Sequence, residues 1–177
     1  MKYALIYGLL SGSVVAATIT AGIIFADSQG FTHSLWFGYT VMFVALSFIF
    51  FGVKRYRDVE RGGVIRFMPA WGMGLAIAVV AGIAYVTIWE IYLASTNYTF
   101  MDEYIAGIAR ARQEAGVAAD AIAREVAEMN SMRELYNNPL ARVGITFLEI
   151  FPVGLIISIV SAALLRNPRL LPARVHQ

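Results

Sequence analysis

Long runs of apolar residues alternate with polar segments along this chain. Four of the runs are long, covering about residues 3–26, 35–53, 70–94 and 140–165. A helix needs about 20 apolar residues to cross the hydrocarbon core of a bilayer. A helix also satisfies its backbone N–H and C=O groups within the segment, as a lipid environment requires. The pattern therefore predicts an all-α integral membrane protein, a single membrane domain with four transmembrane helices.

Composition supports this prediction. Apolar residues make up 59% of the 177 residues and charged residues 15%, against about 45–50% and about 25% in a typical soluble domain. A soluble domain of this size could not bury so much apolar surface.

The first run could instead be a cleaved signal peptide, since Lys2 gives it a positive start. It exceeds the usual apolar region of about 7–15 residues and lacks an A-x-A site, so we favour a span.

Basic residues predict the orientation. The short segment between the second and third runs carries Lys54, Arg55, Arg57, Arg61 and Arg66, and the two ends of the chain add Lys2, Arg166, Arg169 and Arg174. The opposite side has no Lys or Arg in residues 27–34 and only four arginines in residues 96–138. The positive-inside rule therefore places both termini in the cytoplasm. The basic segment could also bind anionic lipid head groups, but we favour a topology signal.

Residues 96–138 form the one sizeable polar insertion. Thr99 followed by Asp102 is typical of a capping box, and it predicts a helix that ends near Gly116. Asp120 begins a second predicted helix, whose apolar residues recur at helical spacing. We therefore expect an extracytoplasmic pair of amphipathic helices that covers the membrane helices, with a surface for partner docking as the alternative.

Small residues recur at intervals of four in three of the runs. Such stripes allow the close approach of helix backbones within a membrane. They predict packing within one four-helix bundle, or alternatively a homodimer through one stripe. The residues concerned are Gly8, Gly12, Gly74, Gly82, Gly154 and Ser158.

Two acidic residues lie within predicted spans. Glu149 lies near the middle of the fourth, and Glu90 lies near the outer end of the third, where it could pair with Arg142. An intramembrane carboxylate is costly unless it is paired, protonated or hydrated. Pro152 frees the carbonyl of Leu148 beside Glu149, and Thr146 or Ser158 could contact the carboxyl group. We favour a neutral, hydrogen-bonded helix contact for Glu149 over proton or cation handling.

Several segments resemble a known family. The run NPLARVGITFLEIFPVGLIISIVSAALLR (138–166) is similar to the C-terminal part of the bacterial membrane proteins grouped as "domain of unknown function 4199". The run GVKRYRD (52–58), followed by GGVI (62–65), resembles that family's inner loop, and WEIY (89–92) resembles the end of its third span. The resemblance covers nearly the whole chain and implies a bacterial four-helix membrane protein, located in the inner (plasma) membrane. It implies no activity and transfers no catalytic residue.

Other chemistry is not indicated. The chain has no Cys, and its two histidines, His33 and His176, are too few for a histidine metal cluster. No phosphate-binding loop, catalytic set or nucleic-acid pattern is recognised. We therefore expect no metal, no cofactor and no enzymatic activity.

We favour an accessory, assembly or structural membrane subunit. Its partner could be the lipid bilayer alone, a second copy of the chain, or an unidentified membrane protein. The alternative is a small dimeric proton-coupled transporter that uses Glu149.

Overall fold

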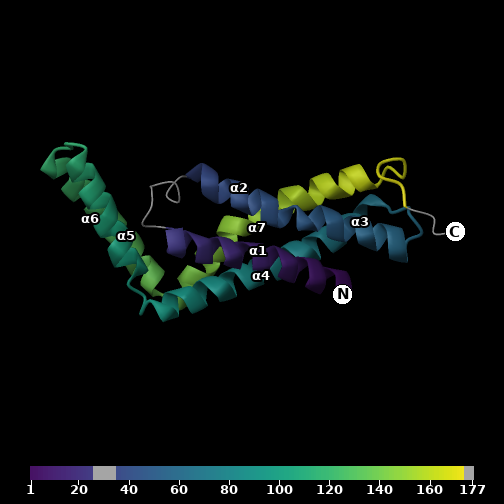
Figure 1. The fold of residues 1–177 in the computed structure, drawn as a ribbon, viewed down its shortest axis with the longest axis horizontal. Coiled ribbons are helices and arrows are strands. Elements are labelled where there is room, and N and C mark those ends of the chain that lie inside the picture. Colours follow the sequence, from purple (N-terminus) through teal and green to yellow (C-terminus); the bar gives the residue numbers. More distant parts are fainter. Residues whose placement is uncertain (26–34, 174–177) are drawn as a thin grey trace. The chain divides into compact units, whose positions relative to one another are not determined.

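The computed structural model describes residues 1–25 and 35–173, and every regular element in these ranges is a helix (Figure 1). The predicted 27–34 loop, His33, Arg174 and His176 lie outside the described residues. The helices are α1 (Lys2–Phe25), α2 (Leu35–Leu46), α3 (Phe48–Glu60), α4 (Phe67–Ser95), α5 (Phe100–Glu114), α6 (Ala119–Asn137) and α7 (Pro139–Leu165). The prediction of an all-helical chain is therefore confirmed for the part of the chain that the structure describes.

Among the described residues, two helices are long and apolar enough to cross a membrane. They are α4, with 29 residues, and α7, with 27 residues. The start of α7 follows from local sequence, because the side-chain Oδ1 of Asn138 accepts hydrogen bonds from the N–H groups of Leu140 and Ala141 at 3.0 and 3.3 Å. Pro139 occupies the first helical position, where its missing N–H costs nothing.

The predicted second span is not one continuous helix. Helix α2 ends at Leu46 and α3 begins at Phe48, with Ser47 between them. The Ser47 hydroxyl donates to the carbonyl oxygen of Val44 at 2.6 Å, and its N–H is shared between the carbonyls of Phe43 and Val44. A serine that bonds to nearby backbone in this way competes with the regular helical pattern. Helix α3 then continues to Glu60, so residues 54–60 of the basic segment expected as a loop are helical.

The chain divides into two compact units. The first contains residues 1–88 and 147–177, of which the structure describes residues 1–25, 35–88 and 147–173. Its core contains Leu46, Ile49 and Val53 from α2 and α3, together with Ile77 from α4 and Ile150 from α7. The Ser11 hydroxyl of α1 donates to the carbonyl oxygen of Ala45 at 2.7 Å, which adds a buried interhelical hydrogen bond.

Small residues mark the closest helix contacts in this unit. A Cβ atom at Gly12 of α1 would lie 2.6 Å from the Cβ of Ala84 in α4, and one at Gly8 would clash with Val80. Between α4 and α7, the contacts pair Gly74 with Ser158, Ala78 with Gly154, and Gly82 with Phe147. All six small residues selected from the sequence therefore lie at contacts within a single copy of the chain.

The second unit, residues 89–146, contains α5 and α6 with the adjoining ends of α4 and α7. Ion pairs join Arg112 to Glu125 and Arg133 to Asp102 between α5 and α6. The chain turns after α5 at Gly116, whose φ of +74° suits glycine. The predicted capping box is wrong: Thr99 has helical φ and ψ angles, and its hydroxyl contacts Glu103 and the carbonyl of Thr96 instead.

Candidate functional site

The ion pair between Glu90 and Arg142 joins α4 to α7 within the second unit. Arg142 Nε donates to Glu90 Oε1 and Nη2 donates to Oε2, both at 2.7 Å, which is the parallel two-bond arrangement that suits a guanidinium and a carboxylate. Arg142 is only 6% exposed. Its Nη1 donates to the carbonyl of Tyr136 at 3.2 Å, and its guanidinium lies 4.9 Å from the centre of the Tyr98 ring. Both charges are thus matched by nearby groups.

Aromatic residues enclose this pair. The Trp89 indole N–H donates to the Tyr136 hydroxyl, and the Trp89 ring packs edge-on against Phe100 with centroids 5.0 Å apart. These contacts connect the end of α4 with α5 and with the end of α6. The arrangement holds the Arg142 guanidinium in one orientation, with its charge paired to the Glu90 carboxylate. This is expected for an ion pair that fixes the positions of the helix ends that it joins.

Glu149 has a different setting. Its side chain is exposed and lies within one turn of the middle of α7, with the Tyr85 hydroxyl 3.5 Å from Oε2. The partners considered from the sequence are not used: Thr146 is buried, and the Ser158 hydroxyl donates to the carbonyl of Gly154 at 2.7 Å. Serine in a helix readily bonds to its own backbone four residues earlier. Pro152 lies within α7, one turn beyond Glu149.

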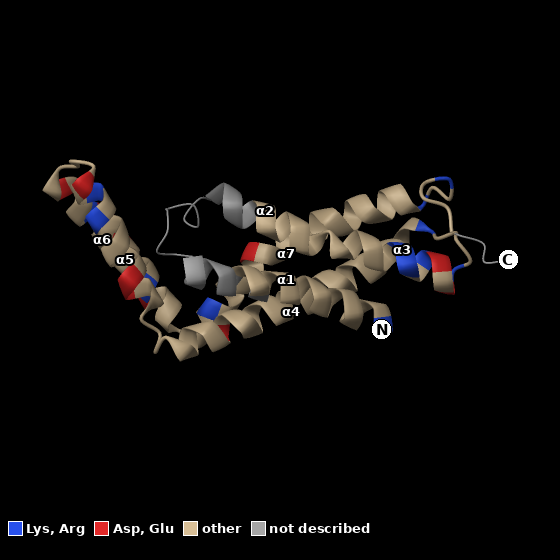
Figure 2. Cartoon of the chain, viewed as in Figure 1, with Lys and Arg blue, Asp and Glu red and all other residues tan. Residues whose placement is uncertain are grey.

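The basic residues gathered near the end of α3 do not share one environment. Figure 2 shows charged residues at this end of the first unit, around the N-terminus and the ends of α3 and α7. Arg55, Arg61 and Arg66 are exposed, whereas Arg57 is completely buried. Arg57 therefore does not present its guanidinium at the surface, where the other basic residues of this segment lie. The Arg57 guanidinium donates to the main-chain carbonyls of Leu170 at 3.0 Å and Leu171 at 2.5 Å, beyond the end of α7.

Asp58 links two of the basic residues. Lys54 Nζ and Arg57 Nε donate to its two carboxylate oxygens, at 2.5 and 2.7 Å. Burial opposes its ionisation, but the hydrogen bonds from Lys54 and Arg57 outweigh burial and hold the pKa of Asp58 below its ordinary value. Asp58 is therefore a carboxylate at neutral pH.

The N-terminus is tied to the same end of α3. Lys2 Nζ lies 2.8 Å from Glu60 Oε1, and the Tyr3 hydroxyl donates to the same oxygen at 3.0 Å. The hydrogen bond from Lys2, then that from Tyr3, lowers the pKa of Glu60. Because both groups of the ion pair are well exposed, its contribution to stability is small.

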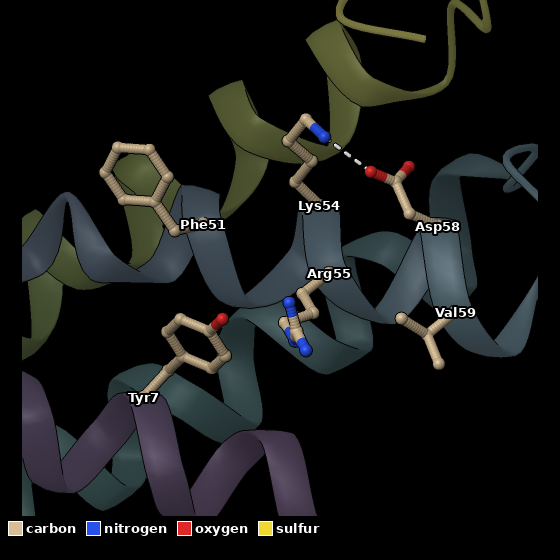
Figure 3. Close-up of a pocket in the computed structure, with 6 residues that line it drawn as sticks. All are labelled: Tyr7, Phe51, Lys54, Arg55, Asp58 and Val59. Carbon is tan, nitrogen blue, oxygen red and sulfur yellow. Dashed lines mark hydrogen bonds and ion pairs between the residues drawn. The ribbon is translucent and has the colours of Figure 1, made fainter. Parts of the chain in front are cut away.

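A pocket of about 220 Å³ opens between α1 and α3 beside these charges (Figure 3). Its lining combines charged, aromatic and aliphatic side chains: Tyr7, Phe51, Lys54, Arg55, Asp58 and Val59. A glycine shapes the contact between the two helices, since a Cβ atom at Gly52 would lie 2.9 Å from Cγ of Tyr7. Sequence reasoning selected Lys54 and Arg55 but missed Tyr7 and Phe51, because nothing in the sequence shows that these two residues are neighbours.

Comparison with known families decides the affiliation of the chain. The family described as "Protein of unknown function (DUF4199)" matches residues 3–167. The chain belongs to the DUF4199 family. The resemblance inferred from the sequence is thereby confirmed. No curated protein and no solved structure matches the chain.

The DUF4199 match covers most of the residues discussed above. It includes Glu90, Arg142 and Glu149, and it includes the pocket between α1 and α3. It ends before Leu170 and Leu171, whose carbonyls accept from Arg57. Because the DUF4199 description names no activity, any function must be argued from the residues themselves.

Proposed function

We propose that this protein is an integral membrane protein whose spans are α1, about residues 35–53 of α2 and α3, α4 and α7. The exposed faces of its helices support this proposal. Leu148, Ile156 and Val160 of α7 are 65%, 62% and 50% exposed, and Leu5 and Leu9 of α1 are 51% and 57% exposed. Each exposed aliphatic side chain would cost free energy in water, at about 25 cal/mol for each Å² of apolar surface. Lipid tails remove that cost.

Both termini lie in the cytoplasm in this proposal, and the protein is in the inner membrane of a bacterium. The start of α1 and the end of α7 lie at the same end of the first unit as the basic residues of α3 (Figure 2), since Lys2 pairs with Glu60 and Arg57 donates to the carbonyl of Leu170. Basic residues collect on the cytoplasmic side of membrane proteins. The α5–α6 hairpin then lies on the opposite side, as an extracytoplasmic amphipathic insertion.

The protein acts, in this proposal, as a non-enzymatic accessory or assembly subunit that contacts another membrane protein or a second copy of itself. One observation carries it, the exposed Glu149 near the middle of α7. A carboxyl group facing lipid costs a few kcal/mol, and a polar group on a partner helix reduces that cost. By contrast, Glu90, Arg142 and Arg57 have hydrogen-bond partners within the chain.

A proton-coupled transporter is the second candidate. The contact that favours it is the pairing of Glu149 with the Tyr85 hydroxyl at 3.5 Å, two proton-exchanging groups on α7 and α4. Four helices are few to enclose a transport path, so this function requires a dimer. In this case, Glu149→Gln would abolish a pH-dependent flux and leave the dimer intact.

Single-cysteine labelling tests the membrane arrangement, because the chain contains no cysteine of its own. A maleimide that cannot cross membranes is expected to label Ala115→Cys, at the end of α5, in cells whose outer membrane is opened. It is expected to label Val64→Cys, between α3 and α4, only after the inner membrane is also opened. Labelling of both positions from the same side would contradict the four-span arrangement.

Co-purification in mild detergent tests the subunit role. The tagged protein is expected to retain a second copy or another membrane protein when it is extracted from its native membrane. Recovery of the monomer alone, at the lowest detergent concentration that solubilises it, would count against an assembly role.

A further inference from the structure

We propose that the pocket between α1 and α3 binds the phosphate group of an anionic phospholipid. The proposal rests on the proposed membrane location, because it takes the ligand from the surrounding bilayer. The lining includes hydrogen-bond donors from both helices: Tyr7 of α1 and Arg55 of α3 lie on one side of α3, and Lys54 lies on its other side with Asp58 (Figure 3). Phosphate oxygens accept hydrogen bonds from each of these groups, and they prefer charged donors.

The pocket has excess positive charge. Lys54 and Arg55 line it, Arg57 lies buried behind Asp58, and Asp58 is the one carboxylate among these four residues. Within residues 1–25 and 35–173, the Arg55 guanidinium and the Tyr7 hydroxyl have no hydrogen-bond partner or ion-pair partner. Lys54 uses one of its three N–H groups on Asp58. The free donors therefore match an anion with several acceptor oxygens.

The pocket is organised before any ligand arrives. Buried Arg57 holds the Asp58 carboxylate through Nε at 2.7 Å, and Asp58 in turn holds Lys54. Gly52 allows the Tyr7 ring to pack directly against α3. Lys54 and the Tyr7 ring, which are already held in place, lose little conformational entropy on binding, which favours affinity.

The walls of the pocket favour a lipid over a soluble phosphate. Helix α3 changes at Lys54 from an apolar sequence to a charged one, which is where a helix leaves the hydrocarbon core. Phe51, one turn before Arg55 on the apolar side of this change, is 54% exposed, and Leu10 on α1, one turn after Tyr7, is 43% exposed. Acyl chains would cover these side chains, whereas inorganic phosphate would leave them in contact with water.

Lipid binding to the purified full-length protein provides the test. The protein in mild detergent, stripped of lipid, is titrated with phosphatidylglycerol or phosphatidylcholine, and bound lipid is counted by native mass spectrometry. The wild type is expected to bind phosphatidylglycerol more tightly than phosphatidylcholine. Arg55→Gln is expected to weaken phosphatidylglycerol binding by about tenfold, and Tyr7→Phe by about threefold, since the guanidinium is a charged donor to the phosphate and the hydroxyl is a neutral one.

Arg66→Gln is the matched control. It removes the same charge from an exposed position between α3 and α4 that does not line the pocket, and it is expected to change the affinity by less than about twofold. Equal losses in Arg55→Gln and Arg66→Gln would overturn the proposal. Inorganic phosphate is added in a competing arm. If it displaces phosphatidylglycerol at comparable concentration, the pocket takes a soluble phosphate and the lipid proposal is wrong.

Alkaline extraction of membranes separates this proposal from the proposed membrane function. All variants are expected to stay in the membrane pellet, because the spans do not depend on Arg55. Release of the wild-type protein into the supernatant would defeat the membrane proposal itself. Retention of every variant in the pellet, combined with unchanged lipid binding by Arg55→Gln, would defeat the lipid site alone.

Discussion

The Arg57 guanidinium donates a hydrogen bond of 3.0 Å to the main-chain carbonyl of Leu170, and so connects α3 with the segment that follows α7. This side chain is completely buried, and it also donates to Asp58 and to the carbonyl of Leu171. A buried guanidinium is tolerated only when acceptors surround it. Arg57 therefore fixes the path of the C-terminal segment and orients the carboxylate of the neighbouring pocket.

Arg57→Gln is expected to lower the free energy of unfolding by about 3 kcal/mol, because it leaves buried carbonyls and the Asp58 carboxylate without their donor. Arg57→Lys is expected to restore only part of the loss, since an ammonium group cannot reach acceptors in several directions as a planar guanidinium does. Thermal unfolding in detergent measures the effect. Arg66→Gln, at an exposed position, is the control, and an equal loss in that variant would contradict a specific role for Arg57.

The Glu90–Arg142 pair is expected to show strong energetic coupling. Glu90→Gln or Arg142→Gln alone leaves one poorly solvated charge, whereas the double variant removes both. We expect a coupling energy of about 1–3 kcal/mol from the double-mutant cycle, as is usual for residues in direct contact. Denaturation of the four proteins in the same detergent supplies the measurement. Additive effects would show that the two hydrogen bonds of 2.7 Å contribute little to stability.

Replacement of glycine by alanine is expected to have opposite effects at two sites. Gly12→Ala places a Cβ atom 2.6 Å from the Cβ of Ala84 and should destabilise the protein by about 1–3 kcal/mol through overpacking. Gly72→Ala places its Cβ in open space on α4 and should stabilise the helix by up to about 1 kcal/mol. Unfolding temperatures of both variants measure the difference. A neutral Gly12→Ala would show that α1 and α4 can separate without loss.

Asp58 is expected to make stability depend on pH in the acidic range. Its pKa in the folded protein is lower than its ordinary value of 3.8. A group with a lowered folded pKa contributes stability that is present above its unfolded pKa and is lost as the pH falls through the folded pKa. Stability should therefore decrease as the pH is lowered below about 4.

The comparison of wild type with Asp58→Asn isolates this contribution, because the other carboxyl groups titrate in both proteins. The difference in unfolding temperature between the two is expected to be largest at neutral pH and to shrink on acidification. A difference that stays constant from neutral to acidic pH would show that the charge of Asp58 is not what stabilises the fold.

Local patterns predicted much of the helix content. Asn138 and Pro139 mark the start of α7, and Gly116 marks the turn after α5, since caps and turn residues act through nearby backbone. The runs around residues 3–26, 70–94 and 140–165 correspond closely to α1, α4 and α7. The break at Ser47 was missed because a single serine inside an apolar run is compatible with an unbroken helix.

The partners of charged residues were harder to predict. Glu90 and Arg142 could be paired on paper because each lies near the same end of a predicted span. Arg57 resembled its exposed neighbours in sequence, but its acceptors are carbonyls more than a hundred residues away. Such contacts depend on how the helices pack, and neither residue type nor spacing encodes them. The same applies to Tyr85, which lies 64 residues from Glu149.

Glu149 provides the last prediction. A glutamine at this position keeps a neutral hydrogen-bonding group beside Tyr85 and towards any partner, whereas a leucine removes it. Glu149→Gln is therefore expected to retain the co-purifying subunit, and Glu149→Leu to retain about threefold to tenfold less, the usual worth of a polar contact between helices in a membrane. Ile156→Leu, on an equally exposed part of α7, is the control and should retain the subunit fully. Because leucine suits a lipid-facing helix, Glu149→Leu should still fold, so its loss of the subunit reports on association.

Equal retention by Glu149→Leu and the wild type would show that no partner depends on this carboxyl group. Loss of a pH-dependent flux in Glu149→Gln, with the complex intact, would favour the transporter instead.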